Sequence, residues 1–215
     1  MKYDIREKEY KFAEAHLSYC RHILDIACGT GTFIERFPYK SKGVDINPEN
    51  VEYCRRKGLS AEVSDALDLD LCETGEFDGV HCSHLIQVFT PDQMVTCLKE
   101  ISRVLKPGGI LVLTTLSDFK NFYQHPENLR PYPLDAILRL FGDRAGATSP
   151  MWAGLPKFKL IKVQTRKQPL VYFRSTASPF FMRLFFRLNK IQRILGLMNP
   201  FKTDAYTAVF QKQEQ

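Results

Sequence analysis

Two glycines and an aspartate near the N-terminus are spaced so that they could contact one small ligand. Gly29 and Gly31 follow the apolar run 23–26, and Asp45 ends a second apolar run about 14 residues later. Glycines let a ligand approach the backbone closely, and such a carboxylate can accept hydrogen bonds from both ribose hydroxyls. The third glycine of a dinucleotide fingerprint would fall at Ile34, whose branched side chain crowds the place where a pyrophosphate would rest. The pattern therefore predicts a nucleoside ligand without a pyrophosphate.

Strands alternate with helices along the chain in a way that brings these residues to one edge of a sheet. The predicted strands are 23–26, a strand ending at 43–45, 61–63, 77–82, 110–115, 158–163 and 204–210. This alternation predicts a single α/β domain over residues 1–215 with a doubly wound, mostly parallel seven-stranded sheet. Ligands bind such sheets at the carboxyl ends of the strands, where Gly29, Asp45, Asp65 and Ser83 all fall.

Three helices are expected before the fifth strand. A charged helix over 5–22 leads into the first strand, and a second runs from Asn47-Pro48 to Lys57, with asparagine as cap and proline in the first turn. The third opens at Pro91, carries an apolar stripe at helical spacing, and stops at Lys106–Gly109.

Five ordered blocks resemble the motifs of class I S-adenosylmethionine (SAM) methyltransferases. They are Asp25-x-Ala27-x-Gly29-x-Gly31, the strand ending at Asp45, Ser64-Asp65-Ala66, Phe77-Asp78-Gly79-Val80 and Arg103–Gly109. The resemblance implies a Rossmann-like fold and SAM as the cofactor. In that family the residue matching Asp65 approaches the adenine amino group, the one matching Ala66 lends a backbone amide to the ring, and the one matching Asp45 holds the ribose. Ala27 replaces a glycine, and we expect it to permit close approach in a β conformation.

The candidate cofactor-binding residues gather at the strand ends. They are Asp25, Ala27, Gly29, Gly31, Asp45, Ile46, Asp65, Ala66 and Ser83. An ordinary turn or helix-cap role is the alternative for Asp65, and an ordinary strand-to-helix turn is the alternative for the glycines.

A narrower resemblance, carried by 43–58 and 122–133, is to SAM methyltransferases of bacterial surface-glycan gene clusters, including those that cap O-antigen chains. Those relatives commonly read Asp-Pro-Thr-His-Val-Arg-Pro in the second segment. Here His125 stands for the aspartate and Asn128 for the histidine. The resemblance implies a glycan or glycan-lipid acceptor and a substrate cap over 117–156.

Methyl transfer to a hydroxyl needs a base, because the hydroxyl proton must leave as the new bond forms. His125, in the loop after the fifth strand, is the first candidate, and His84, at the end of the fourth strand, is its rival or else a packing residue. The candidate substrate residues are Tyr123, Asn128, Arg130 and Tyr132. Arg130 suits an anionic group on the acceptor or clamps its own loop, and the two tyrosines stack on the acceptor or simply pack.

Composition narrows the compartment and the chemistry. The six cysteines show no paired spacing, which favours reduced thiols, and the charged N-terminus lacks a signal-peptide apolar region, so a cytoplasmic protein is expected. His81-Cys-Ser-His84 is rich in ligating side chains, but neighbours on a strand point to opposite faces, so no metal site is expected.

The C-terminal third carries the net charge of +6: residues 144–203 hold 12 Lys or Arg and no acidic residue. Phe180–Met198, within a basic insertion over 165–203 between the last two strands, has the pattern of a basic amphipathic helix. We expect it to lie on the inner face of an anionic membrane, or else to form a lid or dimer helix. Its aromatics lie opposite its charges, which disfavours nucleic acid.

Three functions remain open from the sequence. The first is O-methylation of a glycan or glycan-lipid intermediate. The second is methylation of a small apolar acceptor such as a quinone precursor, and the third is a non-catalytic binding module that keeps the SAM fold.

Overall fold

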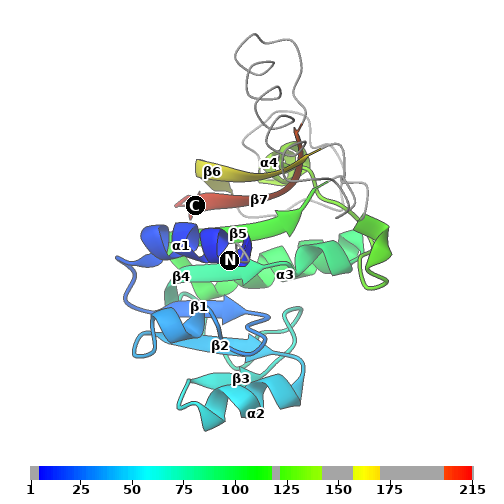
Figure 1. Cartoon of the computed structure of the whole chain (residues 1–215). Coiled ribbons are helices and arrows are strands. Elements are labelled where there is room, and N and C mark those ends of the chain that lie inside the picture. The colour runs from blue at the N-terminus through cyan, green and yellow to red at the C-terminus, as the bar shows by residue number, and fades with distance from the viewer. Residues whose placement is uncertain (1–4, 118–121, 142–156, 170–200, 215) are drawn as a thin grey trace.

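The sheet of this protein has seven strands, in the order β3-β2-β1-β4-β5-β7-β6 (Figure 1). The computed structural model describes residues 5–117, 122–141, 157–169 and 201–214. The strands are β1 (Ile23–Ile26), β2 (Ser41–Asp45), β3 (Ala61–Val63), β4 (Phe77–Ser83), β5 (Leu105–Leu116), β6 (Phe158–Pro169) and β7 (Phe201–Lys212). The first five are parallel, and β7 is antiparallel to both of its neighbours. This confirms the predicted doubly wound, mostly parallel sheet.

Helices cover both faces of the sheet. They are α1 (Ile5–Leu17), α2 (Pro48–Arg56), α3 (Pro91–Val104) and α4 (Leu134–Leu140), with 3₁₀ turns at Ile34–Arg36, Ile86–Val88 and Phe122–Gln124. On β1, Ile23 belongs to the apolar cluster that contains Leu17 of α1, and the next residue, Leu24, belongs to the cluster that contains the apolar residues of α3. Because successive strand residues point to opposite faces, α1 and α3 lie on opposite sides of the sheet.

Two helices begin where the sequence predicts, because their caps are local. The Asn47 side chain accepts a hydrogen bond from the Glu49 amide at 2.9 Å, with Pro48 in the first turn of α2. Thr90 and Gln93 form a reciprocal capping box at the start of α3.

The first helix is shorter than predicted, ending at Leu17 instead of residue 22. The carboxylate of Asp78 at the start of β4 accepts hydrogen bonds from the backbone amides of Arg21 and His22 at 2.8–3.0 Å. Burial raises the pKa of this carboxyl, but the two amides outweigh it and the pKa lies below its ordinary value. A long-range contact therefore ends the helical path and directs the chain into β1.

The helix α3 stops close to the predicted place, just before Lys106–Gly109, but this segment belongs to the strand that follows. The helix ends at Val104, and β5 begins at the next residue. In the pairing of β5 with β4, Leu105 lies opposite Phe77 and Ile110 opposite Gly79. Lys106–Gly109 are thus an irregularity inside the strand, where Gly108 takes a left-handed φ of +74°.

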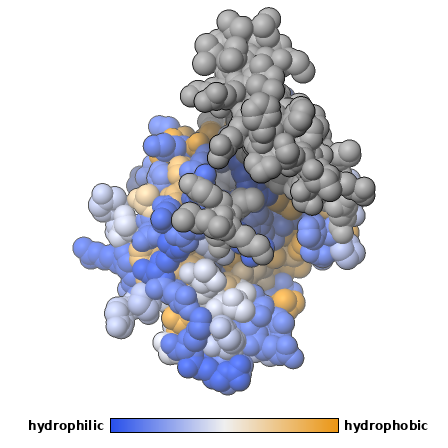
Figure 2. Space-filling view, viewed as in Figure 1, coloured by the Kyte–Doolittle hydropathy of each residue, from blue (hydrophilic) through white to orange (hydrophobic). Residues whose placement is uncertain are grey.

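The last two strands are longer than predicted, and the predicted helix Phe180–Met198 lies outside the described residues, between them in the sequence. The described part of the face seen in Figure 2 is mostly hydrophilic, with small apolar patches. In the described ranges no helix is long and apolar enough to cross a membrane.

Candidate functional site

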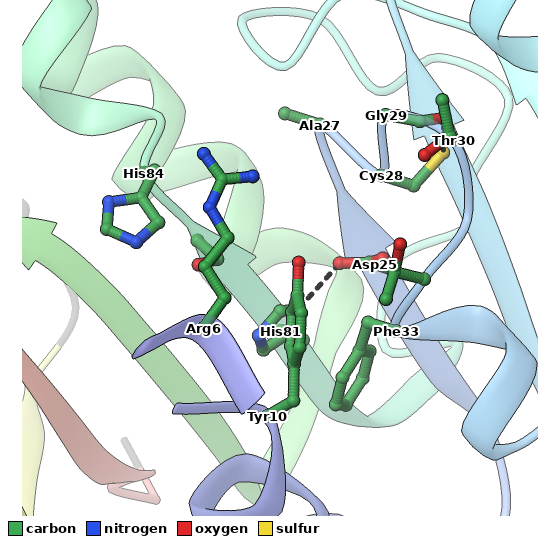
Figure 3. Close-up of a pocket in the computed structure, with 12 residues that line it drawn as sticks. Arg6, Tyr10, Asp25, Ala27, Cys28, Gly29, Thr30, Phe33, His81 and His84 are labelled. Carbon is green, nitrogen blue, oxygen red and sulfur yellow. Dashed lines mark hydrogen bonds and ion pairs between the residues drawn. The ribbon is translucent and has the colours of Figure 1, made fainter. Parts of the chain in front are cut away.

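A cavity of about 110 Å³ opens where the end of β1, the end of β4 and the first turns of α1 meet (Figure 3). Its lining comes from three separate parts of the chain. The lining residues are Arg6, Tyr10, Asp25, Ala27, Cys28, Gly29, Thr30, Thr32, Phe33, His81, Ser83 and His84. Four of the predicted cofactor residues, Asp25, Ala27, Gly29 and Ser83, therefore line one cavity, together with the predicted rival base His84.

The two glycines of the turn serve different purposes. Both have left-handed φ angles, +54° at Gly29 and +81° at Gly31. A Cβ added to Gly29 would meet nothing within 4 Å, so its backbone borders open space that a ligand can approach. A Cβ added to Gly31 would lie 2.8 Å from Leu59 Cδ1 and 2.9 Å from Cys54 Sγ. Gly31 is therefore required by packing against Cys54 of α2 and against Leu59, three residues beyond the end of that helix, whereas Gly29 borders open space.

Ala27 does not adopt the β conformation expected from the sequence. Its φ is +57°, in the left-handed region that disfavours residues with a Cβ. Among the described residues the other non-glycine with a left-handed φ is His84, at +56°. Both line the cavity, which is the distribution expected where backbone strain is maintained at a functional site.

Asp45 lies at the end of β2 and is almost fully buried. Its Oδ2 accepts a hydrogen bond from the Gly29 amide at 2.8 Å, and its Oδ1 accepts from the Asn47 amide at 2.9 Å and Asn50 Nδ2 at 3.2 Å. A carboxylate has about four acceptor positions, so capacity remains on the oxygen that faces the glycine turn. The predicted meeting of Asp45 with the glycine turn is thus present, and Asp45 also fixes the turn itself.

The predicted adenine-side residues lie away from the cavity lining, next to β3. Asp65 is exposed, and its Oδ1 accepts a hydrogen bond from the Leu67 amide at 2.9 Å, which is the turn role considered as the alternative. Ala66 is buried, and Ile46 is 69% exposed directly after Asp45. The exposed apolar side chain of Ile46 lies next to Asp45, the residue predicted to hold the ribose, and the cofactor roles of Asp65, Ala66 and Ile46 stay predictions.

Asp25 and His81 form a buried pair on neighbouring strands. His81 Nδ1 donates a hydrogen bond to Asp25 Oδ1 at 2.6 Å, and both residues are at most 3% exposed. The imidazole stacks on the ring of Phe33, with a centroid distance of 3.8 Å and an interplanar angle of 18°. Burial raises the pKa of the adjoining Cys28 thiol, with Asp25 adding to the effect, so this cysteine is a neutral thiol in the cavity wall.

His84 belongs to a second polar network that joins three elements. Its Nε2 lies 2.9 Å from Glu9 Oε2 of α1, and Glu9 Oε1 accepts from Arg166 Nη1 of β6 at 3.0 Å. Burial raises the pKa of Glu9, but the hydrogen bond from His84 and the positive charges of Arg166 and, when it is protonated, of His84 outweigh it, so the pKa is lowered. The His84 backbone is also fixed, because its amide donates to the Thr114 carbonyl at 2.8 Å and its carbonyl accepts from Gln87 Nε2 at 2.7 Å.

The predicted cap residues are not part of the cavity lining. The His125 side chain is 64% exposed, with Glu127 Oε1 3.8 Å from its Nδ1, and Tyr123 is 70% exposed. The exposed Arg130 has its guanidinium 5.9 Å from the ring centroid of Tyr132. These positions give no support to His125 as the first candidate for the base.

Asn128 and Tyr132 are buried and hold the loop together. Asn128 Nδ2 donates to the Phe122 carbonyl at 2.9 Å. The Tyr132 hydroxyl donates to the Phe89 carbonyl at 3.3 Å, and the backbone carbonyl of Tyr132 accepts from the Tyr206 hydroxyl at 3.0 Å. For Tyr132 the structure favours the packing alternative, and for Asn128 it favours a structural role over contact with an acceptor.

Sequence reasoning missed the contribution of α1 and of His81. Arg6, Glu9 and Tyr10 lie in a charged helix that carries no motif, and their relation to the site depends on where α1 crosses the sheet. One signal was available for His81. It is a polar residue inside the largely apolar strand Phe77–Ser83, so a hydrogen-bond partner on a neighbouring strand is expected. Within the described residues no group of three or more His, Cys, Asp or Glu could hold a metal ion.

Comparisons with known proteins agree with this geometry. Residues 23–109 match the family described as a methyltransferase domain. Over these residues the chain is similar to a methyltransferase domain. The open space beside Gly29 together with the carboxylate of Asp45 fits a nucleoside ligand, which the predicted cofactor SAM contains. A SAM-dependent methyltransferase of Archaeoglobus fulgidus has the same fold, with a TM-score of 0.62 at 21% identity over 99% of this chain and 100% of that one.

Two curated relatives share the methyltransferase region. The ubiquinone biosynthesis O-methyltransferase of Xanthomonas oryzae is 33% identical over 118 residues, 51% of this chain and 48% of that enzyme. The fatty-acid O-methyltransferase of Mycolicibacterium smegmatis is 32% identical over 137 residues, 58% of this chain and 46% of that enzyme. The chain spans about half the length of these relatives.

Proposed function

We propose that this protein is a SAM-dependent O-methyltransferase that acts on a small apolar acceptor with a hydroxyl group, such as a quinone precursor. The observation that carries the proposal is that His84 lines the same cavity as the glycine turn. The names of the two O-methyltransferase relatives support an apolar acceptor. The glycan acceptor rests on the sequence resemblance of 43–58 and 122–133 alone.

His84 is the general base in this proposal. Bound SAM supplies an electrophilic methyl group. The ionised Glu9 carboxylate can only accept, so the neutral imidazole holds its proton on Nε2 and leaves Nδ1 as the acceptor for the hydroxyl proton. As the acceptor oxygen takes the methyl group from SAM, its proton would move to Nδ1, and the imidazolium of His84 would then be paired with the Glu9 carboxylate.

The test measures binding and transfer separately. Calorimetry should give a micromolar-range affinity for SAM and for S-adenosylhomocysteine (SAH). Radiolabelled methyl from SAM should then reach 3,4-dihydroxybenzoate or a prenylated catechol, in preference to a long-chain fatty acid or a lipid-linked sugar. Binding without transfer to any acceptor would favour the non-catalytic module, and transfer to the sugar alone would restore the glycan acceptor.

The basic segment Phe180–Met198 lies outside the described residues, and its membrane partner stays a prediction. Reversal of Arg183, Arg187 and Lys190 to glutamate should abolish co-sedimentation with anionic vesicles while SAM binding stays intact, because each basic residue near such a surface contributes about 1 kcal/mol. Wild-type protein that does not sediment at low salt would favour the lid or dimer alternative.

A further inference from the structure

The buried pair of Asp25 and His81 has no role in the proton transfer proposed above. Both residues line the cavity, yet they come from the interior of the two central strands, where the surrounding side chains are apolar. Neighbouring residues such as Leu24 and Val80 are fully buried and apolar. A charged group in such a place is costly unless it is hydrogen-bonded, so this pair needs a physical explanation.

The geometry fixes which oxygen of Asp25 can act on a ligand. Oδ1 is engaged by His81 Nδ1 at 2.6 Å, and within the described residues Oδ2 has no hydrogen-bond partner. The imidazole itself cannot turn freely, because it stacks on Phe33 and has Tyr10 at a centroid distance of 6.2 Å on another side. His81 therefore holds the carboxylate in one orientation, with its remaining oxygen available to a group in the cavity.

The charges of the cavity wall match the amino-acid end of the cofactor. Asp25 is the acidic residue of the lining, and Arg6 extends from α1 on the opposite side (Figure 3). The nucleoside contacts predicted for Asp45 and Asp65 lie outside this lining. A zwitterionic group that enters beside the glycine turn would thus meet an anion on β1 and a cation on α1.

We propose that His81 is a positioning residue, which orients the Asp25 carboxylate to bind the α-ammonium group of SAM. The proposal deepens the proposed function, since it rests on SAM binding at this cavity. Because His81 Nδ1 donates to Oδ1, the other oxygen of the carboxylate can accept a charge-assisted hydrogen bond from the ammonium group. His81 thereby affects recognition of the amino-acid end of the cofactor and leaves recognition of the nucleoside unchanged.

Two ligands distinguish recognition of the amino-acid end of the cofactor from recognition of its nucleoside. SAH carries both, whereas 5′-methylthioadenosine carries the nucleoside without the amino-acid group. In His81→Leu the affinity for SAH should fall about tenfold or more by calorimetry, as expected for a charge-assisted hydrogen bond that loses its geometry. The affinity for 5′-methylthioadenosine should change less than about twofold. His81→Asn places an amide donor near the position of Nδ1 and should restore most of the SAH affinity.

Asp25→Asn provides a second variant in case His81→Leu fails to fold. It keeps the size and the acceptor for His81 but removes the charge, so it should lose SAH affinity selectively as well. Equal losses for the two ligands, unchanged SAH affinity, or no recovery in His81→Asn would each overturn the role of His81. Wild-type protein that binds neither ligand would instead overturn the proposed function.

Discussion

The two walls of the cavity are held together over very different distances along the chain. On the glycine-turn side, Asp45 contacts the amides of Gly29 and Asn47, which lie 16 and 2 residues away. On the α1 side, Glu9 pairs with His84 and Arg166 across 75 and 157 residues. The glycine-turn side is thus a local supersecondary unit, whereas the side that holds the proposed base exists only in the complete sheet.

The largest effect should come from the α1 side. His84→Ala should lower kcat about 100- to 10,000-fold while SAH affinity changes little, because the imidazole acts only as charge develops on the acceptor oxygen. The measurement is steady-state transfer of labelled methyl to the best acceptor of the panel. His125→Ala is the matched control, and its effect on kcat should be small because its side chain is exposed and outside the cavity lining. A larger loss in the control would move the base to the loop after β5.

On the glycine-turn side, Asp45→Ala should weaken SAH binding by roughly 2 kcal/mol, since it removes a charged acceptor from two hydroxyls. Calorimetry measures the affinity. Asp45→Asn, which keeps the acceptor for the Gly29 amide, serves as the control for loss of the turn and should lose less. If neither variant changes SAH affinity, Asp45 only stabilises the conformation of the glycine turn.

The same contrast explains how far the sequence could be read. The strands β1 to β3, the cap Asn47 and the meeting of Asp45 with the glycine turn follow from local patterns, and the structure contains all of them. The end of α1 at Leu17 depends on Asp78, 61 residues further along the chain. Likewise, the network around His84 depends on α1 and β6 crossing the same strand end. Such contacts leave no periodic pattern in the sequence. Sequence analysis therefore made His84 only the second candidate for the base, after His125, and assigned no role to Glu9 or His81.

Gly31 and Gly29 provide a test inside the turn itself. Gly31→Ala should destabilise the protein by about 1–2 kcal/mol, because a Cβ at φ +81° is strained and would press on Leu59. The measurement is chemical denaturation without ligand. In Gly29→Ala strain alone remains, since its Cβ enters open space, so the stability loss should be smaller and the loss of SAH affinity larger. Equal effects of the two substitutions on both quantities would show that the glycines are not divided between packing and binding.

The smallest effect is expected at Asp78, which binds the backbone amides just before β1 and is not part of the cavity lining. Asp78→Asn should lower stability at neutral pH by about 1 kcal/mol, a value reduced by the partial exposure of the side chain. Because the folded pKa is depressed, the contribution of the carboxylate is fully present above the ordinary value of 3.8 and is lost as the pH falls through the lower folded pKa. Denaturation curves from pH 7 to pH 3 should therefore show the gap between wild type and variant narrowing only in the acid range, below about pH 4. A gap that stays constant across that range would mean that the two amide contacts, and not the charge, provide the stabilisation.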